Sequence, residues 1–280
     1  MYNSEQLDVQ YNLRARHPEF QDIFDRWEER SEEVRSSLPC TLDIAYGDSP
    51  GQTLDVFPGK TPGSPINVFI HGGYWQALDK MFFSYVAKPL VAGGAAVVVI
   101  NYDLAPEVGI DDIVRQTQRA IVWSVLNAAS FEGDGRRLYV SGHSAGGHLT
   151  AMMMAVDWKG EVDLPSDLVK GGAVLSGIFD LESVRRCYLN ETLGMDSDTA
   201  RRNSPIYHLP MREVPLIAAV GGGETEEFLR QTLEYAASWR AKGYPVEEII
   251  MPGLNHYAIM EEVAKPESPL TRAILAQMSL

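Results

Sequence analysis

RLYVSGHSAGGHL, residues 137–149, places a serine in a glycine-rich corner directly after residues that favour a β-strand. Residues 142–146 fit the pattern Gly-x-Ser-x-Gly, in which a sharp turn between a strand and a helix lifts the serine clear of the backbone. The positive end of the following helix favours negative charge near that serine. We therefore interpret Ser144 as a candidate nucleophile, with an ordinary strand–helix turn as the structural alternative.

Short strand-like runs alternate with longer helix-like stretches on both sides of this corner. The predicted strands are Leu42–Tyr46, Thr53–Phe57, Ile66–Ile70, Ala95–Ile100, Leu138–Val140, Ala173–Leu175, Leu216–Val220 and Val246–Met251. The predicted helices are Asp111–Ala129, Ala145–Val156 and Glu226–Lys242. This alternation predicts an α/β fold with one mostly parallel sheet of about eight strands and helices on both faces. The first two strands are expected to form an antiparallel hairpin.

No linker or shift in composition divides the chain, so we expect residues 1–280 to form a single domain. Residues 1–40 are expected to be a helical segment that packs across the sheet edge or over the pocket. Residues 179–210 are polar and irregular, which indicates a small cap-like insertion over one end of the sheet.

The composition limits the classes of partner. The chain has 280 residues, of which 45% are hydrophobic, and a formal net charge of -14. Such a surface repels nucleic-acid phosphates and anionic lipids, so we expect a small-molecule substrate and neither nucleic acid nor membrane. The longest apolar stretch, residues 86–100, is interrupted by Lys88 and Pro89 and is too short to span a bilayer. A homodimer is left open.

The two cysteines, Cys40 and Cys187, lie too far apart in the sequence to form a metal-binding pair. Their small number fits a reducing compartment, and the N-terminus lacks the apolar core of a secretory signal. We expect a cytoplasmic protein with no metal ion and no organic cofactor.

The candidate base is identified by its place in the chain. When a serine lies in a strand–turn–helix corner of this kind, the acid follows it and the histidine comes last. Of the six histidines, only His208 and His256 lie far enough beyond the serine for an acid to fall between the serine and the histidine. His208 lies in the insertion, whereas His256 lies in the loop after the last predicted strand. We therefore expect His256 to reach Ser144.

The candidate acid should follow the predicted strand at 216–220. The segment AVGGGETEEF supplies Glu224 in the loop, while the next two glutamates are better placed to open a helix. We expect Glu224 to orient the imidazole and to stabilise its protonated form. Asp180, which follows the preceding strand, stays open as an alternative acid.

VFIHGGYW, residues 68–75, ends a predicted strand with two glycines. Glycines let main-chain N–H groups turn inward, so this loop can supply a donor to a developing oxyanion beside the amide of Ala145. Tyr74, Trp75 and His143 are assigned to the substrate pocket. A Gly-Gly turn with a buried His71 is the structural alternative.

These segments together resemble the α/β-hydrolase superfamily, and within it the arylformamidase (kynurenine formamidase) branch near the hormone-sensitive-lipase-like esterases. The resemblance covers residues 42–260 and rests on HGGYW at 71–75, NYDLAP at 101–106, GHSAGGHL at 142–149, SGIFDLE at 176–182 and NHY at 255–257. It implies that Gly73 and Tyr74 donate their amides to the oxyanion, with Ala145 completing the hole. Such enzymes commonly have aspartate where this chain has Glu224.

The expected activity follows from the residues and the resemblance together. We expect a serine hydrolase that removes a small acyl group from an aryl amide, with Ser144, Glu224 and His256 as its triad. The resemblance implies N-formylkynurenine as the first substrate to test. A carboxylesterase or carbamate hydrolase acting on short acyl groups is the alternative within this class. A hydrolase-fold protein that binds a ligand without turnover is the alternative from another class.

Overall fold

The computed structural model describes residues 2–280, apart from the side chain of residue 161, and contains an eight-stranded sheet. The strands are β1 (Thr41–Ala45), β2 (Thr53–Phe57), β3 (Ser64–Ile70), β4 (Ala96–Ile100), β5 (Gly133–His143), β6 (Val169–Leu175), β7 (Leu216–Gly221) and β8 (Val246–Met251). Their order across the sheet is β1-β2-β4-β3-β5-β6-β7-β8.

Strand direction agrees with the burial of the residues. β2 pairs antiparallel with β1 and β4, and the remaining neighbours from β4 to β8 are parallel. All residues of β3 and β4 are buried, as is typical of parallel strands that helices cover on both faces. The predicted fold class, a mostly parallel sheet that begins with an antiparallel hairpin, is confirmed.

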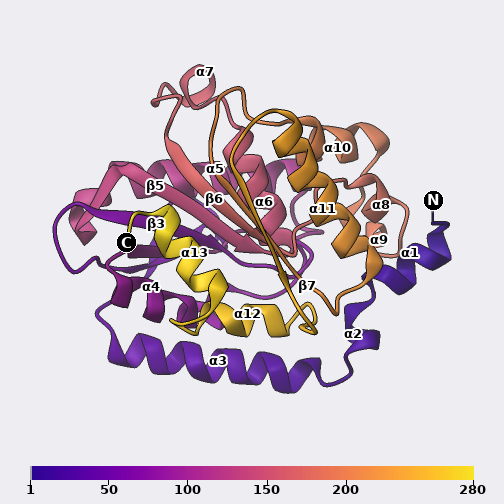
Figure 1. The fold of residues 1–280 in the computed structure, drawn as a ribbon, viewed down its shortest axis with the longest axis horizontal. Helices are drawn as coiled ribbons and strands as arrows, with labels where there is room; N and C mark the ends of the chain where they lie inside the picture. The colour runs from indigo at the N-terminus through magenta and orange to yellow at the C-terminus, as the bar shows by residue number, and fades with distance from the viewer. Residues whose placement is uncertain (1) are drawn as a thin grey trace.

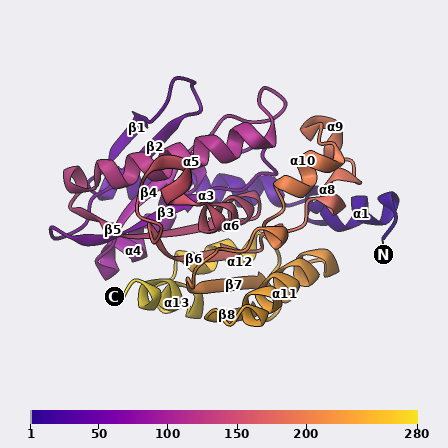
Figure 2. The same cartoon turned by 90° about the horizontal axis from the view of Figure 1, so that it is seen from above.

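Helices cover both faces of the sheet (Figures 1 and 2). α4, α12 and α13 lie on one face, and α5, α6 and α11 lie on the other. None of the helices within residues 2–280 combines the length and the hydropathy that crossing a bilayer requires. The helices are α1 (Ser4–Tyr11), α2 (Leu13–Arg16), α3 (Phe20–Ser37), α4 (Ala87–Gly93), α5 (Ile110–Leu126), α6 (Ala145–Ala155), α7 (Trp158–Val162), α8 (Glu182–Arg185), α9 (Asn190–Leu193), α10 (Ser197–Arg202), α11 (Glu226–Ala241), α12 (Ala258–Val263) and α13 (Pro269–Gln277), with 3-10 turns η1 (Lys80–Phe82), η2 (Ser84–Val86), η3 (Ala128–Phe131) and η4 (Pro205–Tyr207).

The carboxyl ends of the parallel strands bring several loops to one edge of the sheet. Ile70 at the end of β3 pairs with Gly142 of β5, and Leu175 at the end of β6 pairs with His143. β7 and β8 end side by side next to them. Loops that are far apart in the sequence therefore open together at the edge where α/β proteins bind their ligands.

The N-terminal helices pack against the insertion between β6 and β7. α1 contacts α8 and α11, and Figure 2 shows α1 beside α8. Between these elements, the buried Tyr11 hydroxyl lies 2.6 Å from Ser183 Oγ and donates to Glu227 Oε1 at 3.2 Å. α3 packs on η1 and η2. Residues 4–37 therefore form three helices, and buried polar contacts of Tyr11 join α1 to the body of the protein.

Candidate active site

Ser144 stands in a sharp turn between β5 and α6. Its φ of 56° and ψ of -119° lie in a region that residues other than glycine rarely adopt. Two glycines permit the close crossing of the backbones. A Cβ on Gly142 would lie 2.3 Å from the Gly146 carbonyl oxygen, and a Cβ on Gly146 would lie 2.0 Å from the Ile70 carbonyl oxygen. Ser144 lines a cavity at the carboxyl edge of the sheet.

His256 and Glu224 form a buried pair at the same edge. His256 Nδ1 donates to Glu224 Oε2 at 2.7 Å, and both side chains are shielded from solvent. Glu224 follows β7 and His256 follows β8, so two adjacent strand ends bring them together. Because the carboxylate holds Nδ1, Nε2 is the nitrogen left to exchange a proton with a serine. His256 and Ser144 line the same cavity.

The second oxygen of Glu224 has partners of its own. Ser176 Oγ donates to Oε1 at 2.5 Å, and the Gly221 amide donates to the same atom at 2.7 Å. The sequence did not identify Ser176 as part of the site. The motif SGIFDLE, in which it lies, does not indicate that its side chain contacts the loop after β7. The alternative acid, Asp180, instead accepts the N–H of Glu182 and lines a different cavity. The structure therefore brings Glu224 to the histidine and not Asp180.

The loop after β3 lies against the nucleophile. A Cβ on Gly72 would lie 2.9 Å from the His143 carbonyl oxygen and 3.1 Å from Ser144 Cβ. Gly73 has a φ of 113°, and a Cβ there would lie 1.9 Å from the Ala77 carbonyl oxygen. Only glycine fits this backbone without displacing the loop.

Three amides near the serine are available to an oxyanion. Within the described residues, the N–H groups of Gly73, Tyr74 and Ala145 donate to no acceptor. Tyr74 has a φ of 51°, and its phenol donates to the Tyr11 carbonyl oxygen at 2.9 Å, which fixes the ring as a wall of the cavity. Burial raises the pKa of this phenol well above its usual range, so the hydroxyl stays a neutral donor.

Trp75 does not line the cavity, which corrects its assignment to the substrate pocket. Its indole is fully buried, and Nε1 donates to His148 Nδ1 at 3.2 Å. His148 Nε2 in turn donates to the Asn203 carbonyl oxygen at 2.7 Å. Burial lowers the pKa of His148 to about 4, so the ring is neutral and both nitrogens are used. Trp75 therefore joins the loop after β3 to α6 and, through His148, to the insertion.

His143 lines the cavity and also contacts the loop that carries the base. Its Nε2 donates to the His256 carbonyl oxygen at 2.9 Å, and the two ring centroids are 4.5 Å apart. Burial, together with the nearby His256, lowers the pKa of His143 well below its ordinary value. His71 is buried as well and stacks on Tyr102 at 4.3 Å.

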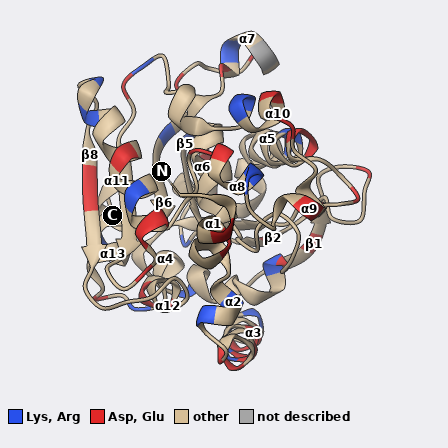
Figure 3. Ribbon diagram, turned by 90° about the vertical axis from the view of Figure 1, so that its right-hand side faces the viewer, with Lys and Arg blue, Asp and Glu red and all other residues tan. Residues whose placement is uncertain are grey.

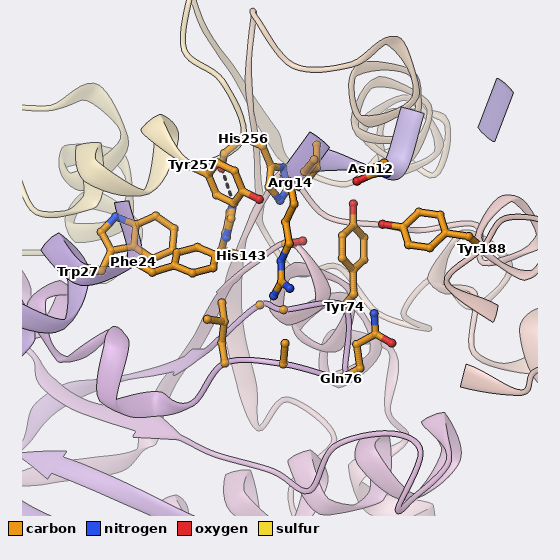
Figure 4. Close-up of a pocket in the computed structure, with 16 residues that line it drawn as sticks. Asn12, Arg14, Phe24, Trp27, Tyr74, Gln76, His143, Tyr188, His256 and Tyr257 are labelled. Atoms are coloured by element: carbon orange, nitrogen blue, oxygen red, sulfur yellow. Dashed lines mark hydrogen bonds between the residues drawn. The ribbon is translucent and has the colours of Figure 1, made fainter. Parts of the chain in front are cut away.

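The cavity has a volume of about 330 Å³ and is enclosed largely by aromatic side chains (Figure 4). The N-terminal helices form much of its wall, although the sequence analysis singled out none of these residues. They are Asn12, Leu13, Arg14, Phe24 and Trp27. Tyr188 of the insertion and Tyr257 beside the base add to the wall.

No group of three or more His, Cys, Asp or Glu in the described part of the chain is arranged to hold a metal ion.

Comparisons with known proteins agree with this fold. The BD-FAE family profile matches residues 54–167. A solved structure of a candidate thioesterase from Silicibacter sp. TM1040 matches with a TM-score of 0.84 and 31% identity, covering 98% of this chain and 99% of that chain. An esterase from Pyrobaculum calidifontis, at 20% identity and a TM-score of 0.71 over 92% of each chain, shares the fold.

A curated relative gives the more specific likeness. Kynurenine formamidase of Danio rerio is 34% identical over 252 residues, which cover 88% of this chain and 84% of that protein. Identity at this level over most of both chains places the protein among the hydrolases of the kynurenine formamidase family, with an α/β-hydrolase fold.

Proposed function

We propose that the protein is a serine hydrolase that removes the formyl group from N-formyl aryl amides, with N-formylkynurenine as the preferred substrate to test. The observation that carries the proposal is the 2.7 Å pairing of Glu224 with His256, whose side chain lines the same cavity as Ser144. The relative named kynurenine formamidase supports the choice of acyl group and of leaving amine. The aromatic wall of the cavity suits an aryl ring.

In the first half of the reaction, Ser144 Oγ attacks the formyl carbon and its proton passes to His256 Nε2. The negative charge on the carbonyl oxygen is stabilised by the amides of Gly73, Tyr74 and Ala145. When the C–N bond breaks, His256 gives the proton to the departing aniline nitrogen. The formyl group is left as an ester on the serine.

In the second half, water attacks the formyl ester while His256 Nε2 takes one of its protons. Collapse of the tetrahedral intermediate breaks the bond between the formyl carbon and Ser144 Oγ, and His256 returns its proton to that oxygen. Formic acid leaves and loses its own proton to water, which gives formate. Glu224 stabilises the protonated imidazole in both halves and keeps its Nδ1–H directed at the carboxylate. The cycle is balanced without any oxidant, reductant or metal.

Short acyl esters are the alternative substrates, because the same steps apply to an alkoxide or thiolate leaving group. The 31% identical candidate thioesterase favours including a thioester in the test. One comparison decides: kcat/KM on N-formylkynurenine, 4-nitrophenyl acetate, acetyl-CoA and an aryl carbamate under one set of conditions, with formate release measured for the first. We expect the formamide to give the highest kcat/KM. A formamide rate at the blank level alongside ester turnover would refute the formamidase assignment.

Localisation and assembly also remain part of this proposal. The cysteines at 40 and 187 are free thiols, which supports a reducing cytoplasm as the working location. A homodimer is the assembly to test, by sedimentation of the purified protein.

A further inference from the structure

Arg14 is a cation in an otherwise uncharged wall of the cavity. It lies in α2, and of the described residues that line the cavity it carries the only permanent charge. Figure 3 shows the basic residues of α2 beside α3. In Figure 4 its side chain extends between the rings of Tyr257 and Tyr74 in this view. The cavity that contains the serine therefore presents a guanidinium to its ligand.

Among the described residues, the guanidinium has no acidic partner. No carboxylate of the described residues lies within 4.0 Å of it, although the chain has a net charge of -14 and pairs many of its other arginines. It is held over the ring of Phe20, with Cζ 5.1 Å from the ring centroid. Stacking on an aromatic face orients the planar group while its N–H edges stay free to bind a carboxylate through two hydrogen bonds.

A second donor lies close to this charge. Within the described residues the Tyr257 hydroxyl forms no hydrogen bond. Burial raises the pKa of this phenol to about 12, while the charge of Arg14 opposes the rise. Burial likewise raises the pKa of Tyr188 to about 12, and Arg14 again opposes it. The guanidinium is thus near two neutral phenols, of which Tyr257 is free to donate.

We propose that Arg14, assisted by the Tyr257 hydroxyl, binds a carboxylate on the leaving group of the substrate. The inference rests on the proposed function for its orientation. A formyl group ends at its carbonyl carbon, so a ligand group that reaches Arg14 while the carbonyl meets Ser144 must belong to the departing amine. The substrate class is then an aryl formamide whose amine part carries an acid group. Arg14 sets this specificity and takes no part in bond breaking.

The test compares substrates that differ in one charge. N-formylkynurenine and its methyl ester share the aryl formamide and the α-amine, and only the first carries the carboxylate. Arg14→Gln should lower kcat/KM on the acid by about 10- to 100-fold, mainly through KM, because a charge-assisted bidentate contact is lost. The loss on the methyl ester should be at least fivefold smaller. Arg14→Lys keeps the charge without the fork and should fall in between.

Arg16→Gln is the matched control, since Arg16 is exposed on the same helix and does not line the cavity. It should change kcat/KM on both substrates by less than about twofold. Equal losses on acid and ester in Arg14→Gln, or no loss on either, would overturn the proposed role of Arg14 and leave the formamidase assignment standing.

A second pair separates the two proposals. The acetate ester of 3-hydroxybenzoate and its methyl ester carry the same difference in charge on a leaving phenol. If formamides are not hydrolysed but Arg14→Gln removes a preference for the acidic aryl acetate, the formamidase assignment fails and the carboxylate site stands. If wild type turns over neither pair, both proposals fail.

Discussion

Ser176 offers a test of how the acid of the triad is held. Its Oγ donates to Glu224 Oε1 at 2.5 Å, while Glu224 Oε2 accepts from His256 at 2.7 Å. The Gly221 amide is the other donor to Oε1. Ser176→Ala removes one of these two donors from a carboxylate that is almost fully buried. The carboxylate then keeps less of the support that directs it at the imidazole.

The size of the effect follows from the charge on the acceptor. A hydrogen bond to a charged group contributes about 1.5–3 kcal/mol net, which corresponds to about a 10- to 100-fold change in rate if the transition state expresses it in full. In the proposed mechanism the carboxylate stabilises the imidazole after it has taken the serine proton, so the lost hydrogen bond acts mainly on the transition state. Ser176 does not line the cavity, so we expect the loss in kcat, with KM within about threefold.

Steady-state kinetics on any substrate that wild type turns over provide the assay, with thermal unfolding as a check on the fold. Ser124→Ala is the matched control, because Ser124 is equally buried and donates to the Ala120 carbonyl oxygen at 2.8 Å within α5. Glycine adopts the backbone φ of 49° at position 176 without strain but has no hydroxyl. The kcat of Ser176→Gly should therefore be as low as that of Ser176→Ala. A folded Ser176→Ala with kcat within twofold of Ser124→Ala, or recovery of kcat in the glycine variant, would refute the reasoning.

Three further predictions use other parts of the site. Glu224→Gln should lower kcat by about 10²- to 10⁴-fold while Asp180→Asn stays within threefold, and the reverse order in the same kinetic assay would reassign the acid. Gly73→Ala forces a Cβ to 1.9 Å from the Ala77 carbonyl oxygen, so kcat should fall at least about 100-fold as the oxyanion amides move; unchanged kcat would contradict this account of the loop. Burial lowers the pKa of His148 from 6.5 to about 4, so the unfolded chain takes up this proton first, and up to about 3 kcal/mol of stability is lost as pH falls through that window. The free energy of unfolding of His148→Gln, measured with denaturant, should fall less than that of wild type between those pH values. An equal fall in variant and wild type would contradict a lowered pKa of His148.

The sequence predicts the sheet well where strand residues are β-branched, and less well where glycines interrupt them. β6 begins at Val169, but only its last residues, from Ala173, carry a strand pattern. The cause is packing: a Cβ on Gly171 would lie 2.7 Å from Gln277 Cδ, and one on Gly172 would lie 2.3 Å from Met154 Sδ. Side chains of helices on the two faces of the sheet leave no room for a Cβ at these glycines. The sequence around them does not show this long-range packing.

Chain order also predicted which carboxylate meets the histidine, because loops that follow adjacent parallel strands open side by side. It could not predict the residues that reach the site through long-range packing. Arg14 enters the cavity wall from a four-residue helix at the N-terminus, and Ser176 meets Glu224 across 48 positions of sequence. The prediction that Trp75 lines the pocket was wrong because its backbone, with a φ of 59°, turns the indole into the core against His148. An aromatic residue after two glycines does not reveal that turn in the sequence.

The nucleophile itself is tested most directly by covalent labelling. Intact-mass and peptide mass spectrometry after treatment with a fluorophosphonate should show one adduct per chain, located on Ser144, with loss of hydrolysis in proportion to labelling. Protein that hydrolyses its substrate at full rate while unlabelled at Ser144, or that carries the adduct on another residue as activity disappears, would contradict the account.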